Sequence, residues 1–73
     1  MKLKIQSRLH VFRAEYRMTQ EQLAKLSGVS RLTVGSMERG DHPASVLAYV
    51  RVAEALGQPV GELLQRSGRI DLY

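Results

Sequence analysis

The chain has 73 residues, with 11 Lys and Arg against 7 Asp and Glu, a formal net charge of +4 and no cysteine. This length allows one domain, which would bury only about 60% of its unfolded surface, and the lack of cysteine excludes disulfides and thiolate metal sites. No apolar run of about 18 residues and no signal-peptide core follows Met1, so we expect a cytoplasmic protein without a membrane span.

The positive charge is concentrated in the first half of the chain. Residues 1–40 carry eight basic and three acidic side chains, a net charge of +5, whereas residues 41–73 have a net charge of −1. This asymmetry favours a polyanionic partner. An ordinary solvated face explains the charge about as well, so charge alone does not decide.

The first 18 residues predict a short strand and a helix. Residues 2–5 alternate polar and apolar side chains, which is typical of a strand. Ser7 can cap a helix over residues 7–17, one face of which would carry Leu9, Phe12 and Tyr16. Met18 would then pack on Leu23 as a hydrophobic staple.

Residues 19–40 contain two helix starts, one turn and one stop. Thr19 and Gln22 have the spacing of a capping box and predict a helix over residues 20–27. Gly28 supplies a left-handed residue for a tight turn, and Ser30 can cap a second helix over residues 31–38. The apolar residues at helical spacing predict a seam around a buried Val29, formed by Leu23, Ala24, Leu26, Val34 and Met37.

The remaining residues predict two further helices after a loop at residues 40–43. Ser45 can cap a helix that ends at Gly57, with a buried face of Val46, Tyr49, Val52, Ala53 and Leu56. Pro59 precedes a last helix over residues 60–66, whose buried face would carry Val60, Leu63 and Leu64.

The two ends of the chain leave two alternatives open. Residues 69–73 alternate polar and apolar side chains like residues 2–5. The two segments could pair as a small antiparallel ribbon, within one chain or between two. Alternatively, both are frayed termini.

The sequence contains three short motifs that begin at Thr19, Gly28 and Glu38, respectively Thr-Gln-Glu-x-Leu-Ala, Gly-Val-Ser-Arg and Glu-x-Gly. In this order and spacing they resemble the Cro/C1-type helix-turn-helix family of phage and bacterial regulators. The resemblance covers residues 6–66 and implies an all-α, five-helix, lambda-repressor-like domain of residues 1–73, with the helix-turn-helix at 19–39. Such a motif docks its second helix in the major groove of double-stranded DNA.

The resemblance places base contacts on the outward face of the second motif helix, at Arg31, Leu32, Gly35 and Ser36, with Thr33 at the margin. An arginine fork matches guanine, a leucine can contact a thymine methyl, and a serine can donate or accept. A phosphate contact is the alternative for Arg31. Gly35 departs from the family, which has a side chain there, and indicates either close approach of the backbone to DNA or, as we favour, a weakened reader.

Phosphate contacts are expected beside this helix. The resemblance assigns one to Gln20, and Thr19 beside it is a second candidate, because free amides at this helix N-terminus attract anions. Further candidates, for each of which plain solvation is the alternative, are Arg39 and His42 in the following loop, and Arg8 and Arg17 on the first helix.

Arg13 and Glu38 stand where the family has a partly buried ion pair. A guanidinium suits bidentate pairing with a carboxylate. We therefore expect these two residues to hold the second motif helix on the first helix of the domain, and we do not count Arg13 as a DNA contact.

Leu47 and Val50 lie off the predicted core face and, with Leu64, could form a self-complementary dimer patch. Scattered surface apolar residues are the alternative.

His10 and His42 are isolated, and no catalytic set, cofactor loop or metal site can be assembled. We expect a dimeric repressor that reads a palindromic operator; the alternative is an antitoxin-like protein-interaction module whose partner binds the C-terminal tail.

Overall fold

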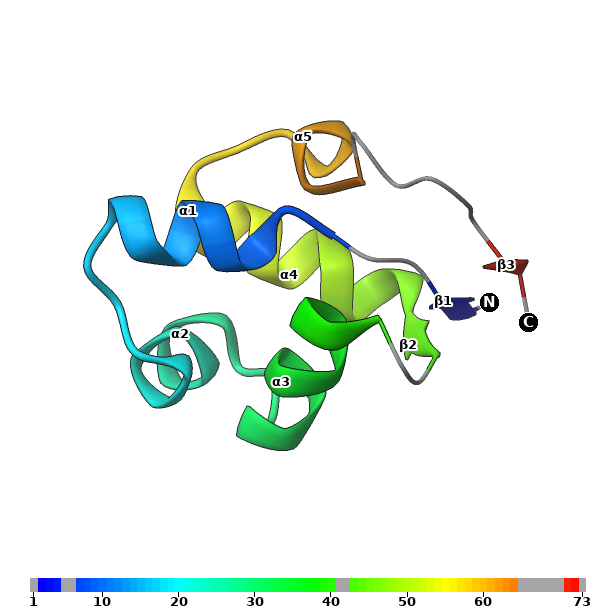
Figure 1. Ribbon diagram of the computed structural model, residues 1–73, viewed down its shortest axis with the longest axis horizontal. Coiled ribbons are helices and arrows are strands. Elements are labelled where there is room, and N and C mark those ends of the chain that lie inside the picture. Colours follow the sequence, from blue (N-terminus) through cyan, green and yellow to red (C-terminus); the bar gives the residue numbers. More distant parts are fainter. Residues whose placement is uncertain (1, 5–6, 41–42, 65–70, 73) are drawn as a thin grey trace.

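The computed structural model describes residues 2–4, 7–40, 43–64 and 71–72, with side chains described for 7–40 and 43–63. Five helices are packed around one core (Figure 1): α1 (Leu9–Glu15), α2 (Gln20–Ser27), α3 (Arg31–Arg39), α4 (Val46–Leu56) and α5 (Val60–Leu64). Three very short strands lie beside them: β1 (Lys2–Lys4), β2 (Ala44–Ser45) and β3 (Asp71–Leu72). The predicted helical fold is confirmed.

The starts of α2, α3 and α4 are confirmed at the predicted capping residues. The Thr19 hydroxyl accepts from the Gln22 backbone amide, and the Gln22 side-chain oxygen accepts from the Thr19 backbone amide, so the capping box is complete. Ser30 and Ser45 cap α3 and α4 in the same way, by accepting from the amide three residues ahead. These local bonds satisfy amides that have no partner within the helix, so sequence alone is enough to locate them.

Helix α1 is shorter than the predicted span of residues 7–17. Its N-cap is Arg8, which makes no side-chain capping bond. The hydroxyl of Ser7, one residue earlier, accepts from the Leu9 amide at 3.3 Å and donates to the Met37 carbonyl oxygen at 2.9 Å. At the other end Arg17 adopts a left-handed conformation, with φ 56°. Tyr16 was predicted on the buried face but is 44% exposed, and its hydroxyl accepts from Gln58.

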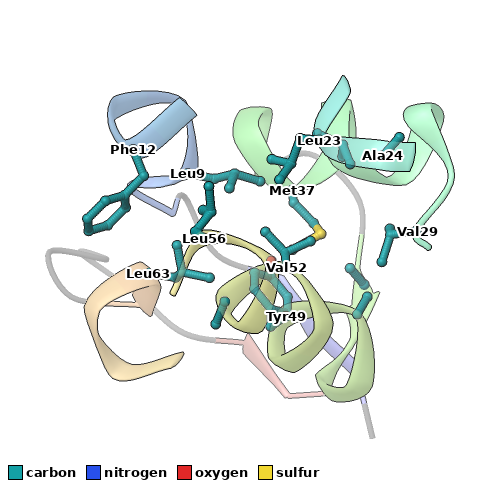
Figure 2. Packing of buried hydrophobic residues seen from close by; sticks show 14 residues of the cluster. Leu9, Phe12, Leu23, Ala24, Val29, Met37, Tyr49, Val52, Leu56 and Leu63 are labelled. Carbon is teal, nitrogen blue, oxygen red and sulfur yellow. The ribbon is translucent and has the colours of Figure 1, made fainter. Parts of the chain in front are cut away.

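The core is built around α4. Figure 2 shows side chains from α1, α2, α3 and α5 converging on Tyr49, Val52 and Leu56. Val34, Met37 and Leu63 are completely buried, and Val29 fills the turn between α2 and α3 at 9% exposure. Leu26, which was predicted in the seam, is instead 58% exposed, because it lies on the outer face of α2.

The chain ends form the ribbon that was one of the two alternatives. β1 pairs antiparallel with β3, with Leu3 opposite Leu72, and on its other edge with β2, with Leu3 opposite Ala44. The small sheet, of order β2-β1-β3, adds one strand to the ribbon; β2 was not predicted because it has only two residues. Ile5, residues 65–66 of the predicted last helix and residues 69–70 lie outside the described residues.

Candidate nucleic-acid interface

The turn between α2 and α3 is fixed by a glycine and a serine. Gly28 has φ 74°, in the left-handed region that a side chain would strain. The Ser27 hydroxyl donates to the Leu23 carbonyl oxygen at 2.7 Å and accepts from the Val29 amide at 3.3 Å. The angle between α2 and α3 is therefore set by the bonds of the Ser27 hydroxyl to the backbone as well as by the buried Val29.

A bidentate ion pair attaches α3 to α1. Arg13 donates through Nε to Glu38 Oε2 at 2.7 Å and through Nη2 to Glu38 Oε1 at 3.2 Å. Its Nη1 donates to the Met18 carbonyl oxygen at 2.9 Å. The Glu38 side chain is only 9% exposed, and its hydrogen bonds raise the pKa of Arg13 above the ordinary value. One guanidinium thus connects α1, the segment before α2 and the end of α3.

Gln20 extends this cluster toward α2. Its Nε2 donates to Glu38 Oε1 at 3.1 Å, so the side chain expected to bind phosphate is already oriented by the ion pair. An amide group has two donor hydrogens, which leaves a second one for another acceptor. Thr19 differs, because the capping box already engages both its amide and its hydroxyl oxygen.

The N-terminal part of α3 presents two of the predicted base-contacting side chains to the exterior. Arg31 is exposed, and Leu32 is 78% exposed, the largest value among the exposed large apolar side chains of the described residues. Thr33 is half-buried and its hydroxyl accepts from Ser30 at 2.8 Å. Ser36 is half-buried one turn further on.

Gly35 is buried, in contrast to its predicted position on the outward face. The Nη1 atom of Arg39 lies 3.0 Å from the point where a Cβ of residue 35 would be. Arg39 itself was predicted in a loop but is the last residue of α3. Its side chain folds back along the helix, and its Nη2 donates to Ser36 Oγ at 3.5 Å.

The other predicted phosphate contacts are more dispersed. Arg8 lies 3.9 Å from Glu62 and its guanidinium carbon is 5.4 Å from the centre of the Phe12 ring, so it has contacts within the fold. Arg17 is exposed at the end of α1. His42 lies outside the described residues.

The predicted dimer patch is exposed at one position. Leu47 is 57% exposed and Val50 is half-buried, whereas the side chain of Leu64 lies outside the described ones. Leu47 also borders a pocket of about 360 Å³, between Val29 and Thr33 on one side and Ala48 and Arg51 of α4 on the other. Nothing in the sequence indicated this pocket, because the residues around it come from separate elements.

Within the described residues, no group of three or more His, Cys, Asp or Glu side chains is arranged to hold a metal ion. None of the described helices has the length and apolar character needed to cross a bilayer.

Comparison with known proteins assigns the family. A family model described as helix-turn-helix matches residues 9–63. An uncharacterized HTH-type transcriptional regulator from Archaeoglobus fulgidus is 36% identical over 59 residues, which are 81% of this chain and 84% of that protein. Control protein C.SmaI from Serratia marcescens is 39% identical over 51 residues, or 70% of this chain, and this match spans only 61% of the control protein.

The fold is also similar to a solved structure. The crystal structure of the restriction-modification controller protein C.AhdI from Aeromonas hydrophila superposes with a TM-score of 0.72 at 39% identity, over 77% of this chain and 85% of that one. The chain with the α2–turn–α3 geometry described above therefore belongs to the helix-turn-helix family of DNA-binding transcriptional regulators.

Proposed function

We propose that this regulator binds a palindromic DNA site as a homodimer, with α3 of each copy in the major groove, and represses transcription by occluding a promoter. The observation that carries the proposal is the pair Arg31 and Leu32 at the start of α3. Both are exposed, Leu32 by 78%, and they match a guanine edge and a thymine methyl respectively. The proposed action needs binding only, with no cofactor and no catalysed reaction.

The ion pair beneath α3 supports sequence reading over simple attraction. A base contact discriminates only if its side chain is presented at a fixed position. Arg13 and Glu38 attach the end of α3 to α1, and Gln20 is held against the same carboxylate. The second amide hydrogen of Gln20 would then bind a phosphate at a fixed distance from α3 and set the register of the helix in the groove.

The dimer follows from the symmetry of such sites. Two copies reading successive major grooves present their recognition helices about 34 Å apart. We assign the contact between copies to the patch of Leu47, Val50 and Leu64, because Leu47 is exposed on α4. Repression, as opposed to activation, rests on analogy with the family.

The test is selection of bound duplexes from a randomised pool at two salt concentrations. The parent chain, Arg31→Ala and Lys25→Ala are compared. Lys25, in the last turn of α2, has a side chain that is 79% exposed and belongs to none of the proposed DNA or dimer contacts, so its removal matches the loss of charge. We expect a two-fold symmetric motif for the parent. Arg31→Ala should lose the base preference at one base pair per half-site, and Lys25→Ala should keep the whole motif.

One outcome contradicts the proposal. If no sequence is enriched and binding disappears with added salt, the attraction to DNA is electrostatic only, and the proposal of sequence-specific binding is wrong. The antitoxin-like alternative would then be preferred, with a protein partner at the C-terminal tail.

A second, more specific candidate is control of restriction-modification genes. It is favoured by the likeness to the restriction-modification controller protein C.AhdI, at 39% identity and a TM-score of 0.72. Occurrence of the selected motif upstream of restriction or methyltransferase genes would support this assignment, and its absence there would count against it.

A further inference from the structure

We propose that Arg39 reads a base from the middle of α3, using the space that Gly35 leaves open, and that Gly35 is neither a weakened reader nor a point where the backbone approaches DNA. The inference rests on the proposed function, since it assigns a specificity residue within the same site. It also replaces the expectation that Arg39 contacts only a phosphate.

The Arg39 guanidinium covers Gly35, which is buried beneath it and lies one helical turn after Arg31 on the same side of α3. Side chains of a helix lean toward its N-terminus, so a residue covers the turn before its own Cα. Arg39 follows this rule: Nη1 lies 3.0 Å and Cζ 3.8 Å from the position of an added Cβ at residue 35. Its Nη2 donates to Ser36 Oγ at 3.5 Å. The charged group therefore lies one turn nearer to Arg31 than its own backbone does.

The backbone of α3 does not require glycine at residue 35. Gly28, Gly40 and Gly57 have positive φ values, and Gly35 does not. Glycine inside a helix lowers stability by about 1 kcal/mol relative to alanine. We attribute the glycine at residue 35 to the space that the Arg39 guanidinium needs, because a Cβ at this position would be only 3.0 Å from it. The Gln20 Oε1 atom, 3.8 Å from the same point, lies on the same surface.

The chemistry of this arrangement suits guanine. A guanidinium presents its donors as a planar fork that can bond guanine O6 and N7 together, which an ammonium group cannot do in the same geometry. Packing over Gly35 and the bond to Ser36 restrict the side chain before DNA arrives, so less rotamer freedom is lost on binding. Arg31 would thus read one position of each half-site from the start of α3, and Arg39 would read a second position from its middle.

Three variants test the inference in the same selection from randomised duplexes. Arg39→Lys keeps the charge but removes the fork. Gly35→Ala keeps the arginine but shifts its guanidinium by a few tenths of an ångström. The close contact is with the end of a flexible side chain, so the fold should survive. Gly61→Ala is the matched control, because a Cβ there has no atom within 4 Å of it among the described residues.

We expect Arg39→Lys and Gly35→Ala to lose the preference for guanine at the same base pair of each half-site, by about tenfold or more. The other positions of the motif should be kept, and the salt dependence of Arg39→Lys should be unchanged. The double variant should lose no more at that base pair than either single variant, since both changes remove one contact. Gly61→Ala should give the parent motif.

Other outcomes overturn the inference in distinguishable ways. If Arg39→Lys keeps every base preference, or weakens all sequences uniformly, Arg39 contacts a phosphate and the inference is wrong while the proposed function stands. If Gly35→Ala, shown by thermal melting to be folded, keeps the guanine preference, the space at residue 35 is not needed for base contact by Arg39, and the inference is wrong. If the parent itself enriches no motif, the proposed function fails, and the inference fails with it.

Discussion

Three polar contacts at the end of α3 meet at the carboxylate of Glu38. Arg13 makes two bonds to it and Gln20 a third. Breaking a buried ion pair leaves an unpaired buried charge and lowers stability by about 3–5 kcal/mol. Because the Arg13 side chain is 25% exposed, we expect a smaller loss for Glu38→Ala, about 2–3 kcal/mol, measured as a lower melting temperature.

The control for this variant is Glu21→Ala. Glu21 pairs with Lys25 at 3.8 Å on the surface of α2, where both side chains are more than two-thirds exposed. Exposed pairs at this spacing contribute about 0.3–0.5 kcal/mol. Equal melting temperatures for the two variants would contradict the role of Glu38 in attaching α3 to α1.

The hydroxyl of Tyr49 is a different kind of buried polar group. It has no hydrogen-bond partner among the described residues, and burial raises the pKa of Tyr49 above its ordinary value of 10.0. Above that pH the unfolded chain releases the proton before the folded chain does, so stability falls as pH rises. Tyr49→Phe should remove this alkaline loss and be neutral or stabilising by about 1 kcal/mol at neutral pH.

Thermal melting of both proteins at about pH 8 and at about pH 10.5 checks this expectation, since the second value lies above the pKa of an unfolded tyrosine. The other tyrosines are common to both proteins, so only the difference between the two curves reports on Tyr49. A variant that is less stable than the parent at both pH values would show that the hydroxyl has a partner in solution.

At the scale of the elements, α1 ends in a motif that usually contains glycine. The Met18 amide donates to the Arg13 carbonyl oxygen at 3.0 Å and the Arg17 amide to that of Ala14 at 3.1 Å, as in a Schellman motif. Arg17 occupies the left-handed position with φ 56°. Arg17→Gly should therefore stabilise the protein by about 0.5–1 kcal/mol, despite the greater freedom of glycine in the unfolded chain.

Arg17→Ala separates this backbone effect from the loss of charge. Alanine keeps the strain and removes the same positive charge, so only the glycine variant should melt at a higher temperature than the parent. If Arg17 contacts a phosphate, both variants should reduce the salt dependence of DNA binding by about one unit of slope. A glycine variant no more stable than the alanine variant would mean that the left-handed position carries no strain.

The elements also show what the sequence could predict. The starts of α2, α3 and α4 depend on bonds between residues three apart, which are visible in the sequence at Thr19, Ser30 and Ser45. At the start of α1 the Ser7 hydroxyl accepts from the nearby Leu9 amide, but it also donates to the Met37 carbonyl oxygen, 30 residues away. Sequence patterns describe the first kind of contact and not the second.

The candidate site divides in the same way. Helical spacing was enough to place Arg31 and Leu32 on the outside of α3, and the family resemblance was enough to pair Arg13 with Glu38. The space over Gly35 could not be predicted, because it depends on the path of the Arg39 side chain. A glycine four residues before an arginine in a helix, without a positive φ to explain it, is a signal that could have indicated it.

At the scale of the whole molecule, the arrangement of the helices determines where a contact between two copies would lie relative to the recognition helices. α2 and α3 lie on one side of α1 and α4, and α5 lies on the other (Figure 1). Leu47, at the beginning of α4, borders the same pocket as Thr33 of α3. A contact between two copies at Leu47 would therefore lie beside the recognition helices and could fix their separation.

Dimerisation through this surface can be tested with two leucines that are matched in exposure. Leu47 is 57% exposed and Leu26, on α2 and outside the proposed patch, is 58% exposed. A buried carboxylate at a dimer contact carries a desolvation penalty that an exposed one avoids. In sedimentation equilibrium we expect the parent and Leu26→Asp to be dimers, and Leu47→Asp to dissociate. A parent that stays monomeric at every concentration would contradict dimerisation. A Leu47→Asp variant that associates as well as Leu26→Asp would show that the contact between copies does not involve Leu47.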